Sequence, residues 1–288
     1  MGSLYGFEIH SELPLRRLNA AAGTRGVQSV DLAAEQLVPP ALAPAAALLD
    51  DDGRRWYASF ELDNGNCLLE MPPAGTFLLE PAAGRVVVGR TDGDDELLEH
   101  RIVSSVLCTL LGQRGDLVLH AATVEVDGSA IVFCGPSLRG KSTLARALGE
   151  AGCALLGEDG IAIELGETGP IAYPGARGVR IRGGGRHRAD LLPDPGPGEP
   201  GPCPVASVIV LGERGATLRI ESLEPARALA FLTPHLIHTG GRAAIGAAFA
   251  RLASLLGSVP AFSVSLPDDL SALPVAAQSL LDSIGIRG

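Results

Sequence analysis

The residues best suited to chemistry lie in one short segment, residues 135–142, which reads Gly-Pro-Ser-Leu-Arg-Gly-Lys-Ser and fits the pattern G-x-x-x-x-G-K-[ST]. A glycine-rich loop turns its backbone N–H groups toward an anion, and a helix that follows the loop points its positive end at the same anion. Lys141 would reach the β- and γ-phosphates of a nucleotide as a compact charge, and the Ser142 hydroxyl would bind Mg²⁺. The segment predicts a nucleotide site, with an ordinary glycine-rich turn as the alternative.

The lysine of this motif is unusual within its own chain. Of the 23 basic residues, 22 are Arg and one is Lys141, a bias that we interpret as the codon usage of a GC-rich genome. An Arg at position 141 would be too large and planar for a phosphate pocket, so the lysine stands where an ammonium is needed. The residues predicted to bind the nucleotide are consecutive: Gly135, Pro136, Ser137, Leu138, Arg139, Gly140, Lys141, Ser142 and Thr143.

Two adjacent carboxylates, Glu158 and Asp159, come directly after the apolar run 154–156. A kinase needs an acidic group for Mg²⁺ and a base near the acceptor hydroxyl. Like charges this close disfavour joint ionisation unless a metal or a cation neutralises them, which suits a metal ligand beside a general base. A solvated acidic turn is the alternative. Glu213, in Gly-Glu-Arg-Gly, reads as a plain hairpin turn.

Histidines and arginines supply weaker candidates. His120 lies inside a predicted strand, where an imidazole is either a hydrogen-bonded core group or a catalyst. His235 and His238 are spaced i, i+3, but the neighbouring Pro234 and the lack of a third ligand argue against a metal site. Arginines around a run of three glycines would steer an anionic substrate or stabilise a transferring phosphoryl group, unless the loop is merely solvated. They include Arg177, Arg180 and Arg182.

The elements that must position these residues divide into two parts near residues 91–94. Residues 1–93 contain short alternating runs bounded by turns, which predict a small antiparallel β module. Residues 94–288 begin with a helical pattern over 94–111 and then alternate strands and helices, which predicts an α/β phosphate-loop domain. The predicted strands of the whole chain are 57–62, 67–71, 76–80, 85–89, 117–126, 130–134, 154–156, 161–165, 171–173, 205–211, 218–221 and 262–266.

Four further helices are predicted in the second part, at 142–150, 225–232, 243–256 and 274–284. The apolar residues of 243–256 that we expect to face the core are Ala247, Phe249, Leu252, Leu255 and Leu256. Residues 193–204 hold six prolines and three glycines, so we expect a mobile loop there.

Composition narrows the class of protein. Apolar residues make up 46% of the 288 and charged residues 19%, which argues against disorder. A net charge of −10 disfavours nucleic acid as a partner. Five scattered cysteines without a C-x-x-C spacing suit a reducing cytoplasm, and neither a signal peptide nor a membrane-spanning run is recognisable. We expect a cytoplasmic protein without membrane or nucleic-acid partners.

Several short segments resemble the HPr kinase/phosphorylase family, including its smaller relatives encoded beside ribosomally made peptides such as lasso peptides. The resemblance spans nearly the whole chain, but only the central part carries specific motifs. These are Leu119-His120-Ala-Ala, Val124-Glu-Val-Asp-Gly, the loop 135–142, and Leu155-Leu-Gly-Glu-Asp159 followed by Ile161-Ala-Ile.

The resemblance implies a phosphate-loop α/β domain similar to the nucleotide domain of phosphoenolpyruvate carboxykinase, and ATP-dependent transfer to a serine hydroxyl. His120 matches the family's active-site histidine, and Glu158 and Asp159 match its Asp-Asp pair, with Asp159 the better match for base and metal contact. Members of the family are often oligomers, so the resemblance is compatible with a homo-oligomer.

This sequence departs from the family pattern in three ways. Leu138 and Arg139 stand where small residues are usual, and Glu158 replaces the first Asp of the pair. The stretch that supports the phosphorylase reaction is not recognisable, which argues against the reverse activity.

The leading hypothesis is a Mg²⁺-ATP-dependent kinase that acts on a serine of a peptide, such as a lasso-type precursor, or of a protein. Two alternatives stay open: a nucleotide-binding regulatory or scaffold protein with decayed catalysis, and a small-molecule kinase. The sequence leaves the choice between ATP and GTP open.

Overall fold

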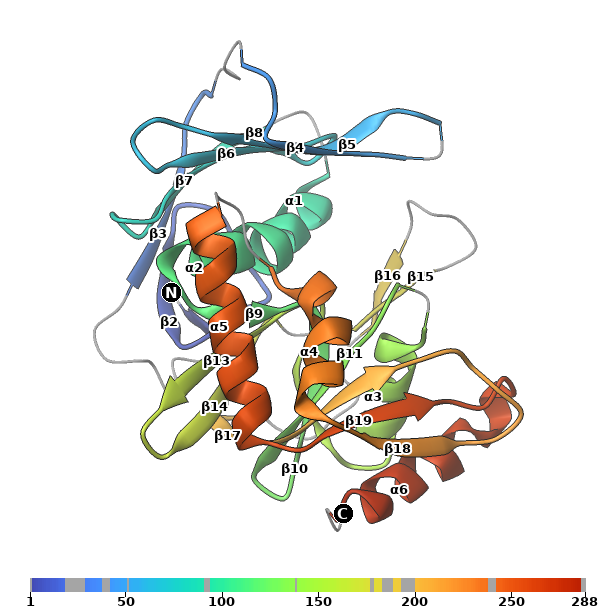
Figure 1. The fold of residues 1–288 in the computed structure, drawn as a ribbon. Coiled ribbons are helices and arrows are strands. Elements are labelled where there is room, and N and C mark those ends of the chain that lie inside the picture. Colours follow the sequence, from blue (N-terminus) through green and yellow to red (C-terminus); the bar gives the residue numbers. More distant parts are fainter. Residues whose placement is uncertain are drawn as a thin grey trace.

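Two large β-sheets organise the chain, an N-terminal sheet of eight strands and a second sheet of nine strands. The structure is a computed structural model that describes residues 2–18, 29–37, 42–50, 52–90, 94–137, 139–176, 179–182, 189–192, 200–237 and 242–285. Figure 1 shows the N-terminal strands and the helices α1 and α2 on one side of the molecule, with the second sheet and the remaining helices on the other.

The eight-stranded sheet has the order β1-β2-β3-β8-β7-β6-β5-β4. Its strands are β1 (Gly2–Leu4), β2 (Phe7–Ser11), β3 (Ser29–Ala34), β4 (Ala46–Leu49), β5 (Arg55–Glu61), β6 (Cys67–Met71), β7 (Gly75–Glu80) and β8 (Arg85–Arg90). The predicted strands of this part are confirmed, but the sheet is not purely antiparallel, because β2 pairs with β3 and β3 pairs with β8 in parallel. The prediction missed this because the pairing joins segments distant in the sequence.

The helical pattern predicted over 94–111 is confirmed, with one irregularity. Helix α1 (Asp95–Arg101) is capped by Asp94, whose side chain accepts a hydrogen bond from the backbone N–H of Glu96. It continues into the π-helix η1 (Ile102–Val106) and the helix α2 (Leu107–Arg114). A π-helical turn interrupts the regular hydrogen-bonding pattern of the α-helix and is often found at functional sites.

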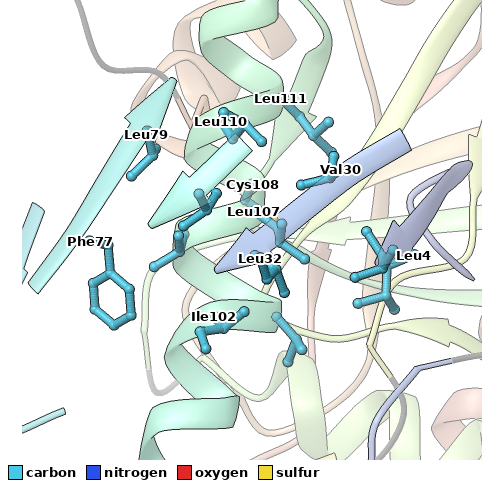
Figure 2. Close-up of a cluster of buried hydrophobic side chains, with 14 of the residues drawn as sticks. Leu4, Val30, Leu32, Phe77, Leu79, Ile102, Leu107, Cys108, Leu110 and Leu111 are labelled. Carbon is cyan, nitrogen blue, oxygen red and sulfur yellow. The ribbon is translucent and has the colours of Figure 1, made fainter. Parts of the chain in front are cut away.

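These helices complete the core of the N-terminal sheet. Figure 2 shows side chains of η1 and α2, such as Leu107, gathered with Leu4 of β1, Leu32 of β3 and Phe77 of β7. The same buried cluster includes Val118 and Ala162 from the second sheet. The core therefore extends across residues 93 and 94, where the sequence predicts a domain boundary.

The nine-stranded sheet has the main order β12-β10-β11-β17-β14-β13-β9, with β19 beside β17 and β18 beside β19. Its strands are β9 (Leu117–Leu119), β10 (Ala121–Val126), β11 (Ser129–Cys134), β12 (Ala154–Gly157), β13 (Ile161–Gly166), β14 (Gly169–Tyr173), β17 (Cys203–Leu211), β18 (Arg219–Leu223) and β19 (Ala261–Ser265). At its centre β11, β17 and β19 run parallel. A separate hairpin is formed by β15 (Val179–Arg182) and β16 (Ala189–Leu192).

Helices cover both faces of this sheet, and the alternation of β11 shows why. Ala130, Val132 and Cys134 face the cluster that contains residues of α4 and α5, whereas Ile131 and Phe133 face the one that contains residues of α3 and α6. The helices are α3 (Lys141–Glu150), α4 (Pro225–Leu232), α5 (Arg242–Ser258) and α6 (Leu273–Ser283), and short 3₁₀ turns lie at η2 (Thr233–His235) and η3 (Leu270–Ala272). All four predicted helices are confirmed.

Two details of the sequence prediction are wrong. Phe249 is 42% exposed and Ala247 is also exposed, because α5 turns Leu252, Leu255 and Leu256 toward the sheet and leaves the opposite side outward. Strand β17 begins at Cys203, so it takes the last two residues of the expected mobile loop into the sheet. Residues 193–199 of that expected loop lie outside the described part of the chain.

Candidate active site

The phosphate-loop motif joins the end of the buried strand β11 to the start of α3. Gly135 and Gly140 have φ values of 151° and 101°, which disfavour residues with a side chain. A Cβ at Gly135 would lie 2.8 Å from the carbonyl oxygen of Leu211 on the neighbouring parallel strand, and a Cβ at Gly140 would lie 2.8 Å from Nη2 of Arg214. Backbone conformation favours glycine at both positions, and at Gly135 the close approach of the β17 backbone requires it as well.

Lys141, the first residue of α3, folds back over this loop. Its Nζ donates hydrogen bonds to the carbonyl oxygens of Gly135 at 2.7 Å and Pro136 at 3.4 Å. Burial lowers the pKa of Lys141, while the nearby Asp159 and Glu158 act in the opposite direction and favour its charged form. The ammonium therefore rests against the loop carbonyl oxygens, and the predicted carboxylate pair is near enough to favour its charge.

The two carboxylates follow β12 but differ in accessibility. Glu158 is 5% exposed, whereas the Asp159 side chain is 36% exposed. Asp159 has a φ of 64°, a left-handed conformation that residues other than glycine seldom adopt and that is often found where function requires it. Of the pair, Asp159 is the carboxylate that a substrate can reach.

His120 lies between two strands, not inside one. The predicted strand 117–126 is wrong here, because β9 ends at Leu119 and β10 starts at Ala121. β9 pairs with β13, while β10 pairs with β11 and β12. The backbone N–H of His120 donates to the carbonyl oxygen of His235 at 2.7 Å, and its Nδ1 lies 2.9 Å from the carbonyl oxygen of Asp159.

His235 is a residue that the sequence analysis set aside. The segment after α4 runs antiparallel to β9, with a bridge between Leu119 and Leu236 and a hydrogen bond from the N–H of Ile237 to the carbonyl oxygen of Val118. Burial, together with the charges of Lys141 and His120, lowers the pKa of His235 to about 4. His235 thus adds a neutral imidazole to the site. The pairing of its segment with β9 brings it there, and no residue spacing in the sequence indicates that pairing.

A second missed histidine comes from α1. Nε2 of His100 lies 3.7 Å from Oδ2 of Asp159. The helix that carries His100 belongs to the core of the N-terminal sheet, so that part of the chain reaches the carboxylate directly.

The loop also meets the turn after β17. Arg139 forms an exposed ion pair with Glu213, with 3.1 Å between Nη2 and Oε1, and Arg214 donates to the carbonyl oxygen of Pro267 at 3.0 Å. The sequence predicts a plain hairpin turn for Glu213. Strand β17, the parallel neighbour of β11, ends just before this turn and so places Glu213 opposite the loop. Such an exposed pair contributes little to stability, so its Arg139 is free to change partner when an anion binds.

The remaining predicted residues fall into two groups. Pro136 and Ser137 are exposed on the loop, and Ser142 and Thr143 are partly buried in the first turn of α3. Leu138, Arg177 and His238 lie outside the described residues, as do the side chains of Arg180 and Arg182, whose backbone forms β15.

No cluster of three or more His, Cys, Asp or Glu side chains that could hold a metal ion is found among the described residues. None of the helices in the described ranges is long and apolar enough to cross a membrane. All five cysteines are buried, and none of them forms a disulfide.

No protein-family model matches the sequence, and no curated protein matches it. One solved structure is similar to part of this chain. It is described as the structure of the Hpr(Ser) kinase/phosphatase from Coxiella burnetii, with 18% identity and a TM-score of 0.36, over 58% of this chain and 94% of that chain.

Proposed function

We propose that the protein is a Mg²⁺-ATP-dependent kinase that transfers the γ-phosphoryl group to a serine hydroxyl of a peptide or protein. The observation that carries the proposal is the position of Lys141, whose ammonium donates to carbonyl oxygens of the glycine-rich loop while the charges of Asp159 and Glu158 favour its protonated form. A cation between a phosphate cradle and a carboxylate is the arrangement that phosphoryl transfer needs, because positioning and charge stabilisation supply most of the catalysis.

The residues present fit a nucleotide with its metal. Mg²⁺ in such sites is held by one or two protein oxygens and by the phosphates of the substrate, so a cluster of three protein ligands is not required. Ser142 and Asp159 would supply the protein oxygens. The bound ion would neutralise charge on the β- and γ-phosphate oxygens.

Each residue then has a separate task. Lys141 exchanges the carbonyl oxygens of Gly135 and Pro136 for phosphate oxygens, which are stronger acceptors for an ammonium. Asp159 accepts the proton of the acceptor hydroxyl as that oxygen attacks phosphorus. His120 holds the backbone of Asp159 through its Nδ1. Glu158 adds negative charge that favours the protonated form of Lys141 and so opposes the effect of burial.

The acceptor follows from the resemblance described above, which points to a serine of a ribosomally made precursor peptide of the lasso type. We propose that this peptide is the substrate and that the protein works in the cytoplasm, without nucleic-acid or membrane partners. Two other readings make different predictions. A scaffold with decayed catalysis would bind nucleotide without transfer, and a small-molecule kinase would leave serine peptides unmodified.

The test measures binding and transfer on the same preparation. Calorimetry with a non-hydrolysable ATP analogue and Mg²⁺ reports binding, and transfer of labelled γ-phosphate to serine peptides reports turnover. Lys141→Met should reduce turnover by at least about 10³-fold, because the lost charge acts on the transferring group. Arg146→Met is the matched control, because Arg146 lies on the same helix in a surface pair with Glu150.

The outcomes separate the candidate functions. Turnover by Lys141→Met equal to that of the wild type would overturn the proposal. Nucleotide binding without transfer to any peptide encoded beside the gene would favour the scaffold. Transfer to metabolites alone would favour the small-molecule kinase.

A further inference from the structure

Three buried polar residues connect the N-terminal segment to α1. Arg17, Glu99 and His100 are each 8% exposed. Glu99 Oε1 accepts hydrogen bonds from the backbone N–H groups of Arg16 and Arg17, the latter at 2.7 Å. Burying a carboxylate is costly unless it is hydrogen-bonded, so these two bonds fix the segment that carries Arg17 onto α1.

The contact between Arg17 and His100 determines where the imidazole carries its proton. Nη1 of Arg17 lies 3.1 Å from Nδ1 of His100. A guanidinium has only donors, so Nδ1 of His100 must accept in this hydrogen bond. The proton of the neutral ring is therefore on Nε2, the atom that faces Asp159.

Two histidines of opposite tautomer consequently lie beside Asp159. His120 carries its proton on Nδ1, because the carbonyl oxygen of Asp159 only accepts. His100 carries its proton on Nε2, at 3.7 Å from Oδ2 of Asp159. This distance is longer than a hydrogen bond, and contacts of this kind commonly tighten when substrate binds.

We propose that His100 is a positioning residue for Asp159 and that Arg17 sets its tautomer. The Nε2–H of His100 orients one oxygen of the carboxylate and leaves the other toward the metal ion and the acceptor hydroxyl. The N-terminal segment is thereby part of the active site, because it supplies the arginine that selects the tautomer. The inference rests on the proposed kinase function, in which Asp159 takes the proton.

Variants at position 100 separate positioning from packing. His100→Gln keeps a donor for Asp159 and an acceptor for Arg17, whereas His100→Met keeps much of the volume and has neither. We expect His100→Met to lower kcat about 100-fold, as misplacement of a reacting group does, with KM for ATP changed less than about twofold. His100→Gln should recover most of this loss. Equal losses in both variants, or no loss in His100→Met, would overturn the positioning role.

His10→Gln is the matched control. His10 lies on β2 of the N-terminal sheet, whose core α1 completes, and contacts two carboxylates, Glu8 and Asp31, but its side chain is 42% exposed. The turnover of His10→Gln should equal that of the wild type. If His10→Gln lost as much turnover as His100→Met, a general disturbance of the N-terminal sheet would explain both losses and the proposal would fail.

The tautomer can be measured without activity. Nitrogen-15 spectra of histidine-labelled protein at about pH 8, where neutral imidazole dominates, distinguish the two ring nitrogens, and His100→Gln identifies the signal. We expect the Nε2–H form in the wild type and a mixture of tautomers in Arg17→Met. An Nδ1–H ring at His100 in the wild type would overturn the assignment, even if His100→Met failed to fold.

This pair of measurements separates the two proposals. A wild-type protein that shows the Nε2–H form but transfers no phosphate refutes the kinase function, and the positioning role falls with it. A wild-type protein that transfers phosphate while His100→Met matches its turnover refutes the positioning role alone.

Discussion

The carbonyl oxygen of Asp159 accepts a hydrogen bond from Nδ1 of His120 across 2.9 Å. Asp159 has a left-handed backbone with a φ of 64°, and His120 interrupts the strand path between β9 and β10. Each residue departs from regular structure at the point where it meets the other. An unfavourable conformation persists only where surrounding contacts hold it, so this bond fixes the turn that presents the Asp159 carboxylate.

Asp159→Asn tests the proposed base without disturbing this turn. Asparagine tolerates a left-handed conformation and keeps the size of the side chain, but it cannot accept the proton. We expect turnover to fall by at least about 10³-fold, within the range for a lost general base, while the melting temperature changes little. Asp127→Asn is the control, because Asp127 also has a positive φ, at 50°, but lies in the hairpin between β10 and β11. Similar losses at both positions would contradict the assignment.

Gly160, next to Asp159, should tolerate no side chain. A Cβ there would overlap Sγ of Cys108 in α2, and the hydroxyl of Tyr5 lies just beyond it. Gly160→Ala should therefore lower the free energy of unfolding by roughly 1–3 kcal/mol, as overpacking of a core does, and reduce turnover by displacing Asp159. Denaturant unfolding and kinase assays measure the two effects.

A double mutant identifies the overlap as the cause. Cys108→Ala removes the sulfur, so Gly160→Ala combined with Cys108→Ala should cost less than the sum of the two single changes. Gly166→Ala is the control, because Gly166 ends β13, the strand that follows Gly160, and its Cβ would meet only an ordinary contact at 3.6 Å. A strictly additive double mutant would contradict the explanation.

His235 predicts a loss of stability in mild acid. Its pKa is lowered to about 4 in the folded protein from 6.5, chiefly by burial. Between these two pKa values the unfolded chain binds more protons than the folded protein. The contribution of the neutral His235 side chain to stability is therefore intact above pH 6.5 and is lost as the pH falls toward 4. The free energy of unfolding should decrease by up to about 2 kcal/mol on going from about pH 7 to about pH 5.

His235→Gln removes the titrating group and should flatten that part of the stability profile. Urea unfolding of both proteins at matched pH values makes the comparison. An identical slope in the two proteins would show that other groups cause the acid sensitivity and that His235 does not.

Lys141 offers a chemical probe of the nucleotide site, because it is the one lysine among 23 basic residues. Burial lowers its pKa, which enlarges the neutral, nucleophilic fraction at a given pH. An amine-directed acylating reagent should modify Lys141 and the α-amine, and saturating Mg²⁺-ATP should protect Lys141 only. Peptide mass mapping measures both rates, with the α-amine as internal control. Modification of Lys141 at an unchanged rate in the presence of ATP would contradict the nucleotide site.

The sequence by itself determined what depends on local pattern. The loop 135–142 is recognisable from residue types alone, since the glycines and the lysine are needed for backbone conformation and charge. The helices and the predicted strands followed from apolar periods of 3.6 and 2, and the continuous apolar run of β11 indicates that both of its faces are buried. The strands β1 to β4, β15 and β16 were not predicted.

Only the tertiary structure decided which distant residues meet at Asp159. His235 reaches His120 because its segment pairs with β9, and His100 reaches Asp159 because α1 completes the core of the N-terminal sheet. The break at His120 has the same origin, since the flanking strands pair with different neighbours. An apolar period shows which side of an element is buried, but not which segment covers it; strand pairing and side-chain hydrogen bonds between distant residues settle that.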